Sequence, residues 1–130
     1  MQRLIILTVA ATLAALTAPA QDWAKARLDK SPRHLEYVTV KSGNREVKCF
    51  IAFPEVKEKA TAVVVIHEIF GLSDWVRSAT DQLAEAGYIA IAPDLLTGTP
   101  GAGGADAARG AISALPADQI TADLTVTYSR

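Results

Sequence analysis

Apolar and polar residues alternate along two neighbouring stretches of the chain, Glu36–Lys41 (EYVTVK) and Glu46–Phe53 (EVKCFIAF). This period of two, carried by β-branched and aromatic residues, is typical of β-strands. Between the two stretches, Ser42–Arg45 (SGNR) has the composition of a hairpin loop. The pattern therefore predicts a β-hairpin over residues 36–53.

Two later stretches are continuously apolar, Thr61–His67 (TAVVVIH) and Tyr88–Ala92 (YIAIA). Such runs are typical of parallel strands covered on both faces, so we expect Thr61–His67 to be a central strand. Between the runs, apolar residues recur at helical spacing over residues 72–86. Candidate caps flank this helix: Ser73 or Asp74 at its start and Gly87 at its end. The strand–helix–strand unit predicts a parallel sheet with a right-handed crossover.

The rest of the chain is patterned more weakly. Residues 21–35 are polar and lack periodicity, which predicts an extended leader ahead of the domain. The glycine-rich Thr97–Gly104 (TGTPGAGG) is expected to form a flexible loop. Short helices are expected over residues 105–115 and over residues 116–124. The closing Thr125–Arg130 (TVTYSR) is rich in β-branched residues, which disfavour a helix.

The first 20 residues have the three-part layout of a secretory signal peptide. Met1–Arg3 is a short positive start, Leu4–Leu16 is an uncharged apolar run, and Thr17–Ala20 offers small residues for cleavage. A membrane-spanning helix needs about 20 apolar residues. The run is shorter, although an uncleaved anchor is the alternative. We therefore expect export to a periplasmic or secreted location, with the domain formed by residues 36–130.

Composition narrows the class of protein further. A chain of 130 residues has room for one domain, and a net charge of −1 without a dense basic cluster argues against a nucleic-acid partner. The single cysteine, Cys49, excludes an intramolecular disulfide. No His, Cys and Asp cluster has metal-ligand spacing, and Gly98–Gly104 lacks the Lys-Ser/Thr of a phosphate-binding loop. We therefore expect neither a metal nor another cofactor.

Two carboxylates stand where the predicted parallel strands end, Glu68 after His67 and Asp94 after Pro93. Ligands of open parallel sheets bind outside the carboxyl ends of the strands. Both acids should therefore face one rim of the sheet, where backbone N–H groups can compensate for lost water. Two interpretations stay open: the acids are polar strand ends bonded to their own loops, or they belong to a site.

Two motifs flank the predicted helix, His67–Gly71 (HEIFG) before it and Gly87–Leu95 (GYIAIAPDL) after it. Their combination is far more specific than either half, and it resembles the dienelactone hydrolase family. The resemblance covers roughly Glu36 to Leu124, about the first half of a family member, because such domains run to roughly 200–250 residues. It implies the α/β-hydrolase fold, an α/β architecture of three layers with a mostly parallel sheet, incomplete here. It also implies hydrolysis of a small-molecule ester or lactone by a Cys or Ser nucleophile, an Asp and a His.

The resemblance further implies roles for three neighbouring residues. Glu68 is expected to contact the nucleophile in the resting enzyme. The backbone N–H of Ile69 is expected to help form the oxyanion hole, and Phe70 is expected to bind substrate. The fold places one oxyanion donor in the loop after this strand, which agrees with the position of Ile69.

The nucleophile itself is absent from these 130 residues. No G-x-S-x-G or cysteine equivalent occurs, and the nearest stretch, Gly71–Trp75 (GLSDW), lacks the second glycine. Ser73 within it is better explained as a helix cap. Cys49 lies mid-strand and is expected to be a buried small hydrophobic residue. The triad histidine comes last in chain order, whereas His34 and His67 come early.

The segment after Asp94 departs from the pattern of the family members that cleave dienelactone. Those members carry an Arg shortly after the Pro-Asp-Leu segment and bind the substrate carboxylate with it. Leu96–Pro100 (LTGTP) contains no Arg. Dienelactone itself is therefore not the expected substrate.

Three functional hypotheses follow. The first is the N-terminal part of an exported dienelactone-hydrolase-like enzyme, inactive alone because it has no nucleophile–base pair. The second is a non-catalytic exported module that completes its sheet with a partner chain or by self-association through an open sheet edge. The third, a flavodoxin-type ligand-binding domain, ranks last because Glu68–Leu72 is apolar and acidic where a phosphate-binding loop is needed.

Overall fold

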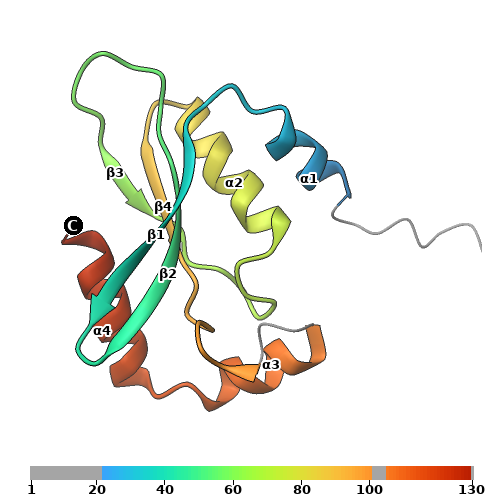
Figure 1. The fold of residues 1–130 in the computed structure, drawn as a ribbon, viewed down its shortest axis with the longest axis vertical. Coiled ribbons are helices and arrows are strands. Elements are labelled where there is room, and N and C mark those ends of the chain that lie inside the picture. The colour runs from blue at the N-terminus through green and yellow to red at the C-terminus, as the bar shows by residue number, and fades with distance from the viewer. Residues whose placement is uncertain (1–21, 101–104, 130) are drawn as a thin grey trace, which may run out of the picture.

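A computed structural model describes residues 22–100 and 105–129. These residues form one four-stranded sheet with helices on both faces (Figure 1). The elements in chain order are α1 (Asp22–Asp29), β1 (Leu35–Ser42), β2 (Arg45–Ala52), β3 (Ala62–Val64), α2 (Asp74–Glu85), β4 (Ile89–Pro93), α3 (Ala105–Ala114) and α4 (Ala117–Tyr128). The strands lie in the order β1-β2-β4-β3, so the last two strands of the sheet are out of sequence order.

The predicted hairpin is confirmed. β1 and β2 pair antiparallel from Leu35↔Ala52 to Ser42↔Arg45. Gly43 in the connecting turn has a φ of 60°, a left-handed conformation that glycine adopts without steric cost. The hairpin therefore forms where alternation and turn composition both favour it.

The predicted strand–helix–strand unit is also confirmed. β3 and β4 pair in parallel, with Ala62 opposite Ile89, and α2 connects them. Ser73 is the N-cap of α2, and its Oγ accepts a hydrogen bond from the Val76 N–H at 3.4 Å. Gly87 follows the helix with a φ of 98°. Local capping chemistry thus sets both ends of α2.

The position and length of β3 differ from the prediction of a central strand over residues 61–67. β3 has only three residues, pairs with β4 on one side, and is the edge strand of the described sheet. Its valines are half-buried, and Ile66 just beyond it is 60% exposed. A continuously apolar run indicates a strand that can be covered on both faces. It does not determine whether another strand pairs with its outer edge. Since β1–β2 and β2–β4 are antiparallel, the described part of the sheet is mixed rather than mostly parallel.

Three layers are present, as the α/β fold class predicts. Figure 1 shows α1 and α2 on one face of the sheet and α4 on the other. The core beneath α1 and α2 is formed by Leu28, Phe50, Ala52, Val76, Ala84 and Ala92. The opposite core is formed by Val40, Val47, Cys49, Ile51 and Ile91. The burial of Cys49 confirms its expected place in the core.

Residues 21–35 were expected to be extended, and this expectation is wrong for most of them. Asp22–Asp29 form helix α1, which packs against α2. The connection to β1 is held by Arg33, whose Nε and Nη2 donate to the two carboxylate oxygens of Asp81 in α2 at 2.7 and 2.8 Å. Ser31 Oγ donates to the same carboxylate at 2.7 Å. A periodicity test misses this helix because tertiary contacts, not an apolar stripe, hold it in place.

The buried ion pair between Arg33 and Asp81 shifts the pKa of both side chains. Burial by itself raises the pKa of Asp81, but hydrogen bonds from Arg33 and Ser31 and the charge of Arg33 outweigh burial. The pKa of Asp81 is therefore lowered. The hydrogen bond to Asp81 correspondingly raises the pKa of Arg33. Asp81 is thus an ionised and fully buried side chain of α2.

The two C-terminal helices are confirmed as α3 and α4, but α4 runs further than predicted. It continues to Tyr128 through the β-branched residues that disfavour a helix. The hydroxyls of Thr125 and Thr127 donate to the carbonyls of Thr121 and Asp123 at 2.7 Å, four residues earlier. These bonds satisfy the hydroxyls inside the helix, and packing of α4 on the sheet stabilises the segment.

The predicted signal peptide, residues 1–20, lies outside the described residues, as does part of the predicted loop, residues 101–104. Within the described ranges, no helix has the length and apolar character needed to cross a membrane.

Candidate active site

The loops that follow β3 and β4 are held together by His67, at the rim where the sequence places the two acids. His67 is 6% exposed, and its Nδ1 lies 2.8 Å from the carbonyl oxygen of Glu68. Its Nε2 lies 3.0 Å from the backbone N of Leu95. Because an amide N–H can only donate, Nε2 is the acceptor and Nδ1 carries the proton donated to Glu68. A neutral imidazole of fixed tautomer therefore joins the two loops.

The carboxylate of Glu68 is exposed rather than buried in the core. Its Oε2 accepts a hydrogen bond from the Phe70 N–H at 2.9 Å, and its carbonyl accepts one from the Gly71 N–H at 3.2 Å. Gly71 has a φ of 75°, and a Cβ there would lie 3.1 Å from Cδ1 of Leu96. The loop thus turns sharply at a position that favours glycine, with Glu68 closing the turn.

Ile69 and Phe70 stand at the outside of this turn, 39% and 42% exposed. Within the described part of the chain, the backbone N–H of Phe70 is bonded to Glu68, whereas the N–H of Ile69 has no hydrogen-bond partner. An unpartnered amide in an exposed turn can serve as an oxyanion-binding donor, because such a donor must be free before the substrate arrives.

Asp94 is turned towards its own loop. Its Oδ1 accepts a hydrogen bond from the Leu96 N–H at 3.1 Å and lies 3.8 Å from Nε2 of His67. Its backbone N–H donates to the carbonyl of Lys48 at 2.7 Å. These contacts match the first of the two interpretations, a polar strand end that organises the loop after it.

Arg45 is a structural member of this rim that its sequence position did not reveal. Its Nη2 and Nη1 donate to the carbonyls of Leu95 and Thr97 at 2.9 and 2.6 Å. Its Nε lies 3.1 Å from Oδ2 of Asp123 in α4. Arg45 and His67 therefore hold the carbonyl and the amide of the same residue, Leu95. Arg45 stands in a turn-forming stretch, so only the folded chain brings it beside the loop after β4.

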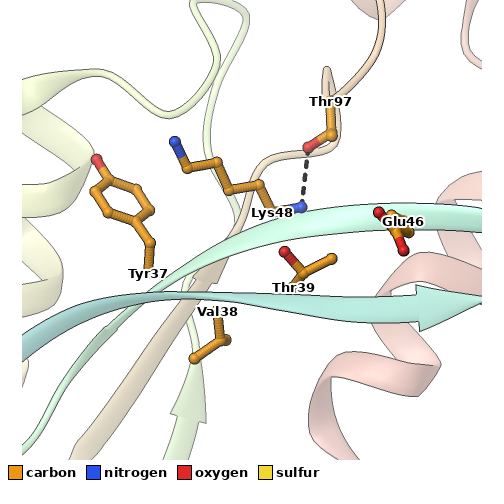
Figure 2. A pocket seen from close by; sticks show the side chains of 6 residues that line it. All are labelled: Tyr37, Val38, Thr39, Glu46, Lys48 and Thr97. Carbon is orange, nitrogen blue, oxygen red and sulfur yellow. Dashed lines mark hydrogen bonds between the residues drawn. The ribbon is translucent and has the colours of Figure 1, made fainter.

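The pocket in Figure 2 lies over the hairpin and the loop after β4. It has a volume of about 170 Å³ and is lined by Tyr37, Val38, Thr39, Glu46, Lys48 and Thr97. Nζ of Lys48 lies 4.2 Å from the centre of the Tyr37 ring, and the Lys48 N–H donates to Oγ1 of Thr97 at 3.1 Å (Figure 2). Neither Glu68, Ile69 nor Phe70 lines this pocket. It is therefore separate from the predicted site.

The other nucleophile and base candidates have structural roles. Cys49 is fully buried, and its Sγ donates to the Val47 carbonyl at 3.7 Å. Ser73 caps α2. His34 is exposed, with Nε2 lying 3.2 Å from Oε2 of Glu36. Among residues 22–100 and 105–129, no group of three His, Cys, Asp or Glu side chains is placed to hold a metal.

The layered sheet, with a tight glycine turn after a parallel strand and an unpartnered amide on that turn, has the features of part of an α/β-hydrolase domain. Comparison with known proteins identifies the family. The model of the dienelactone hydrolase family matches residues 47–128, more than half of the chain. The chain belongs to the dienelactone hydrolase family.

Individual relatives agree with this assignment. The chain is 40% identical over 74 residues to "Putative hydrolase fragment YghX" of Escherichia coli K12. This aligned region covers 55% of this chain and 63% of that protein. It is 43% identical over 56 residues to a "Putative carboxymethylenebutenolidase" of Saccharolobus solfataricus, over 43% of this chain and 21% of that protein. The crystal structure of a "Putative Dienelactone Hydrolase" from Klebsiella pneumoniae superposes with a TM-score of 0.65 at 27% identity, over 75% of this chain and 42% of that chain. The chain thus spans less than two thirds of the length of each of these relatives.

Proposed function

We propose that this chain is the N-terminal portion of an exported ester or lactone hydrolase of the dienelactone hydrolase type. Ile69 supplies a backbone N–H to the oxyanion, Glu68 contacts the nucleophile of the resting enzyme, and Phe70 contacts the substrate. The observation that carries the proposal is the glycine turn after β3, which leaves the Ile69 N–H without a partner while Glu68 holds the Phe70 N–H. Family membership supports the reaction class.

The contacts around the turn explain how the chain could prepare such a donor. His67 fixes the Glu68 carbonyl, and the Gly71 N–H closes the turn on the same carbonyl. The peptide plane between Glu68 and Ile69 is therefore held at its carbonyl end, which orients the N–H of Ile69. A donor fixed before reaction needs no reorganisation when negative charge develops on the substrate oxygen.

The chain by itself is proposed to be catalytically inactive. Its 130 residues contain no glycine-flanked Ser or Cys and no late histidine, so the nucleophile–base pair is missing. Assay of the chain on an aryl ester should give the background rate. A rate well above background that Glu68→Ala abolishes would refute the proposal.

A hybrid enzyme tests the role of the Ile69 amide. Residues 47–128 of this chain would replace the matching part of a catalytically active full-length family member. Ile69→Pro removes the N–H and should lower kcat about 100- to 1,000-fold, the usual effect of losing one oxyanion donor. Ile69→Ala keeps the N–H and is the matched control, expected to stay near the parent rate. Equal loss in both variants would mean that the side chain, not the amide, matters.

Export is part of the proposal and rests on the layout of residues 1–20. Fusing these residues to a reporter that is active only outside the cytoplasm should give activity. Replacing Leu7 and Val9 with Lys interrupts the apolar run and should abolish the activity. Activity that survives this change would contradict the signal-peptide assignment.

A second candidate, a non-catalytic exported module completed by another chain or copy, is favoured by one observation. β3 has no strand on its outer side within the described residues, and an unpaired edge can accept another strand. Light scattering separates the two candidates. A folded, monodisperse dimer of the chain alone would favour the module, and a misfolded or aggregating chain would count against it.

A further inference from the structure

Both backbone polar groups of Leu95, in the loop after β4, are bonded to side chains from distant parts of the chain. The Leu95 N–H donates to Nε2 of His67 at 3.0 Å, and the Leu95 carbonyl accepts a hydrogen bond from Nη2 of Arg45 at 2.9 Å. Leu95 is 4% exposed, so both groups depend on these partners rather than on water. The position of Leu95 is therefore set by Arg45 on one side and by His67 on the other.

Arg45, the first residue of β2, is itself held by further bonds. Its Nη1 donates to the carbonyl of Thr97 at 2.6 Å, and its Nε donates to Oδ2 of Asp123 in α4 at 3.1 Å. Asp123 is 1% exposed, and Arg45 is its ion-pair partner. A guanidinium is planar and its donors form a fixed fork, so bonds in three directions leave it little freedom. Arg45 thus fixes residues 95–97 relative to β2 and α4.

His67 has a competing partner at the nitrogen that faces Leu95. Oδ1 of Asp94 lies 3.8 Å from Nε2, close enough to replace the Leu95 N–H after a small movement. A carboxylate can only accept a hydrogen bond, so Nε2 would then have to carry the proton. In a neutral imidazole, Nδ1 would lose its proton and with it the hydrogen bond to the Glu68 carbonyl. The Leu95 N–H therefore selects the tautomer that holds the Glu68 carbonyl.

We propose that Arg45 is a positioning residue for the oxyanion donor. By holding the Leu95 carbonyl, Arg45 keeps the Leu95 N–H on Nε2 of His67, and the imidazole stays in its Nδ1–H tautomer. The Nδ1–H group then fixes the Glu68 carbonyl and, through that peptide plane, the direction of the Ile69 N–H. Arg45 acts through these groups rather than on the substrate. This inference rests on the proposed function, in which Ile69 donates to the oxyanion.

Nitrogen NMR of the full chain tests the tautomer directly, because protonated and unprotonated imidazole nitrogens resonate far apart. At pH 8, where an ordinary imidazole is neutral, the parent chain should show His67 protonated at Nδ1 alone. Arg45→Lys keeps a positive charge beside Asp123, but an ammonium lacks the planar fork that reaches both loop carbonyls. We expect a substantial share of the Nε2–H tautomer in this variant, together with a shifted amide resonance of Ile69. A parent-like spectrum for both groups would overturn the proposal.

Two further variants separate the carbonyl contacts of Arg45 from its ion pair. Asp123→Asn removes the ion pair but leaves Arg45 both carbonyl bonds, so it is the matched control and should show the parent tautomer. Arg45→Met combined with Asp123→Asn leaves no buried charge without a partner, so it should fold and should show the tautomer change. Circular dichroism checks that each variant is folded. A tautomer change in the control as large as that in the Arg45 variants would overturn the proposal.

Kinetics distinguish a failure of this inference from a failure of the proposed function. In the hybrid enzyme, extended to begin at Arg45, Arg45→Lys should lower kcat about ten-fold with KM near the parent value, because the oxyanion donor is displaced but not removed. An unchanged kcat in Arg45→Lys, with the expected loss in Ile69→Pro, would remove the positioning role and leave the oxyanion role. A hybrid in which Ile69→Pro is as active as Ile69→Ala would contradict the oxyanion role, and the NMR experiment would still decide whether Arg45 sets the tautomer of His67.

Discussion

The two faces of the sheet differ in how far the chain itself completes them. The face under α1 and α2 has a closed core, and the buried pair of Arg33 and Asp81 fastens the N-terminal segment across α2. The face under α4 has its own core, but a groove stays open beside β3. The first face is stabilised by contacts within residues 22–93, whereas the second presents apolar surface that the described residues leave uncovered. The closed core therefore lies on one face of the sheet, and the open apolar groove lies on the other.

The largest loss of unfolding free energy is expected from breaking the ion pair on the closed face. Asp81→Ala leaves the guanidinium of Arg33, 10% exposed, without its buried partner and should cost about 3–5 kcal/mol of unfolding free energy. Asp29→Ala is the control, because it removes an exposed, solvent-screened pair with Lys25 and should lower the unfolding free energy far less. Urea unfolding monitored by circular dichroism measures both. Similar costs for the two variants would mean that the closed face is not fastened by Asp81.

The same pair makes the closed face sensitive to acid. The pKa of Asp81 is lowered in the folded chain, so its contribution to stability is fully present above the pKa of the unfolded state, about 3.9. The contribution is lost as the pH falls below that value towards the lower folded pKa. Unfolding free energies measured between pH 6 and pH 2.5 should therefore fall more steeply in the parent chain than in Asp81→Ala. Parallel curves would show that another carboxyl group dominates the acid response.

The smallest expected effect is the difference in unfolding free energy between two Val→Ala substitutions, one on each face of the sheet. Val76→Ala truncates a side chain that is 1% exposed in the closed core and should cost about 2 kcal/mol. Val64→Ala truncates a half-buried valine that lines the groove and should cost about 1 kcal/mol or less. Thermal unfolding of the two variants measures this difference in unfolding free energy, and equal costs would contradict the comparison of the two faces.

Much of the site region could be read from the sequence because its signals are local. The capping serine Ser73, the glycines at 71 and 87 and the strand ending at Pro93 fix a turn, a helix and a second strand. The positions of Glu68, Ile69 and Phe70 after β3 follow from that order. Their catalytic roles stay predictions, since the comparisons establish the family and not the chemistry of single residues.

The contacts that join distant segments could not be read in this way. Helix α1 has no apolar periodicity of its own, and the Arg33–Asp81 pair that holds the segment behind it joins residues 48 apart in the chain. Arg45 belongs to a hairpin turn by composition, yet it binds the loop after β4. The position of a charged residue in the sequence does not predict its partner, because the partner is whichever group lies close to it in the folded chain.

The sequence by itself determined the hairpin, the parallel β3–α2–β4 unit and the family motif around Glu68, because strand alternation, helix capping and glycine turns act between near neighbours. Tertiary structure alone decided that β3 lies at an edge, that His67 joins two loops as a neutral imidazole, and that one sheet face stays partly open. The physical reason is that local backbone preferences act over a few residues, whereas coverage of a sheet depends on which segments are present to pack against it.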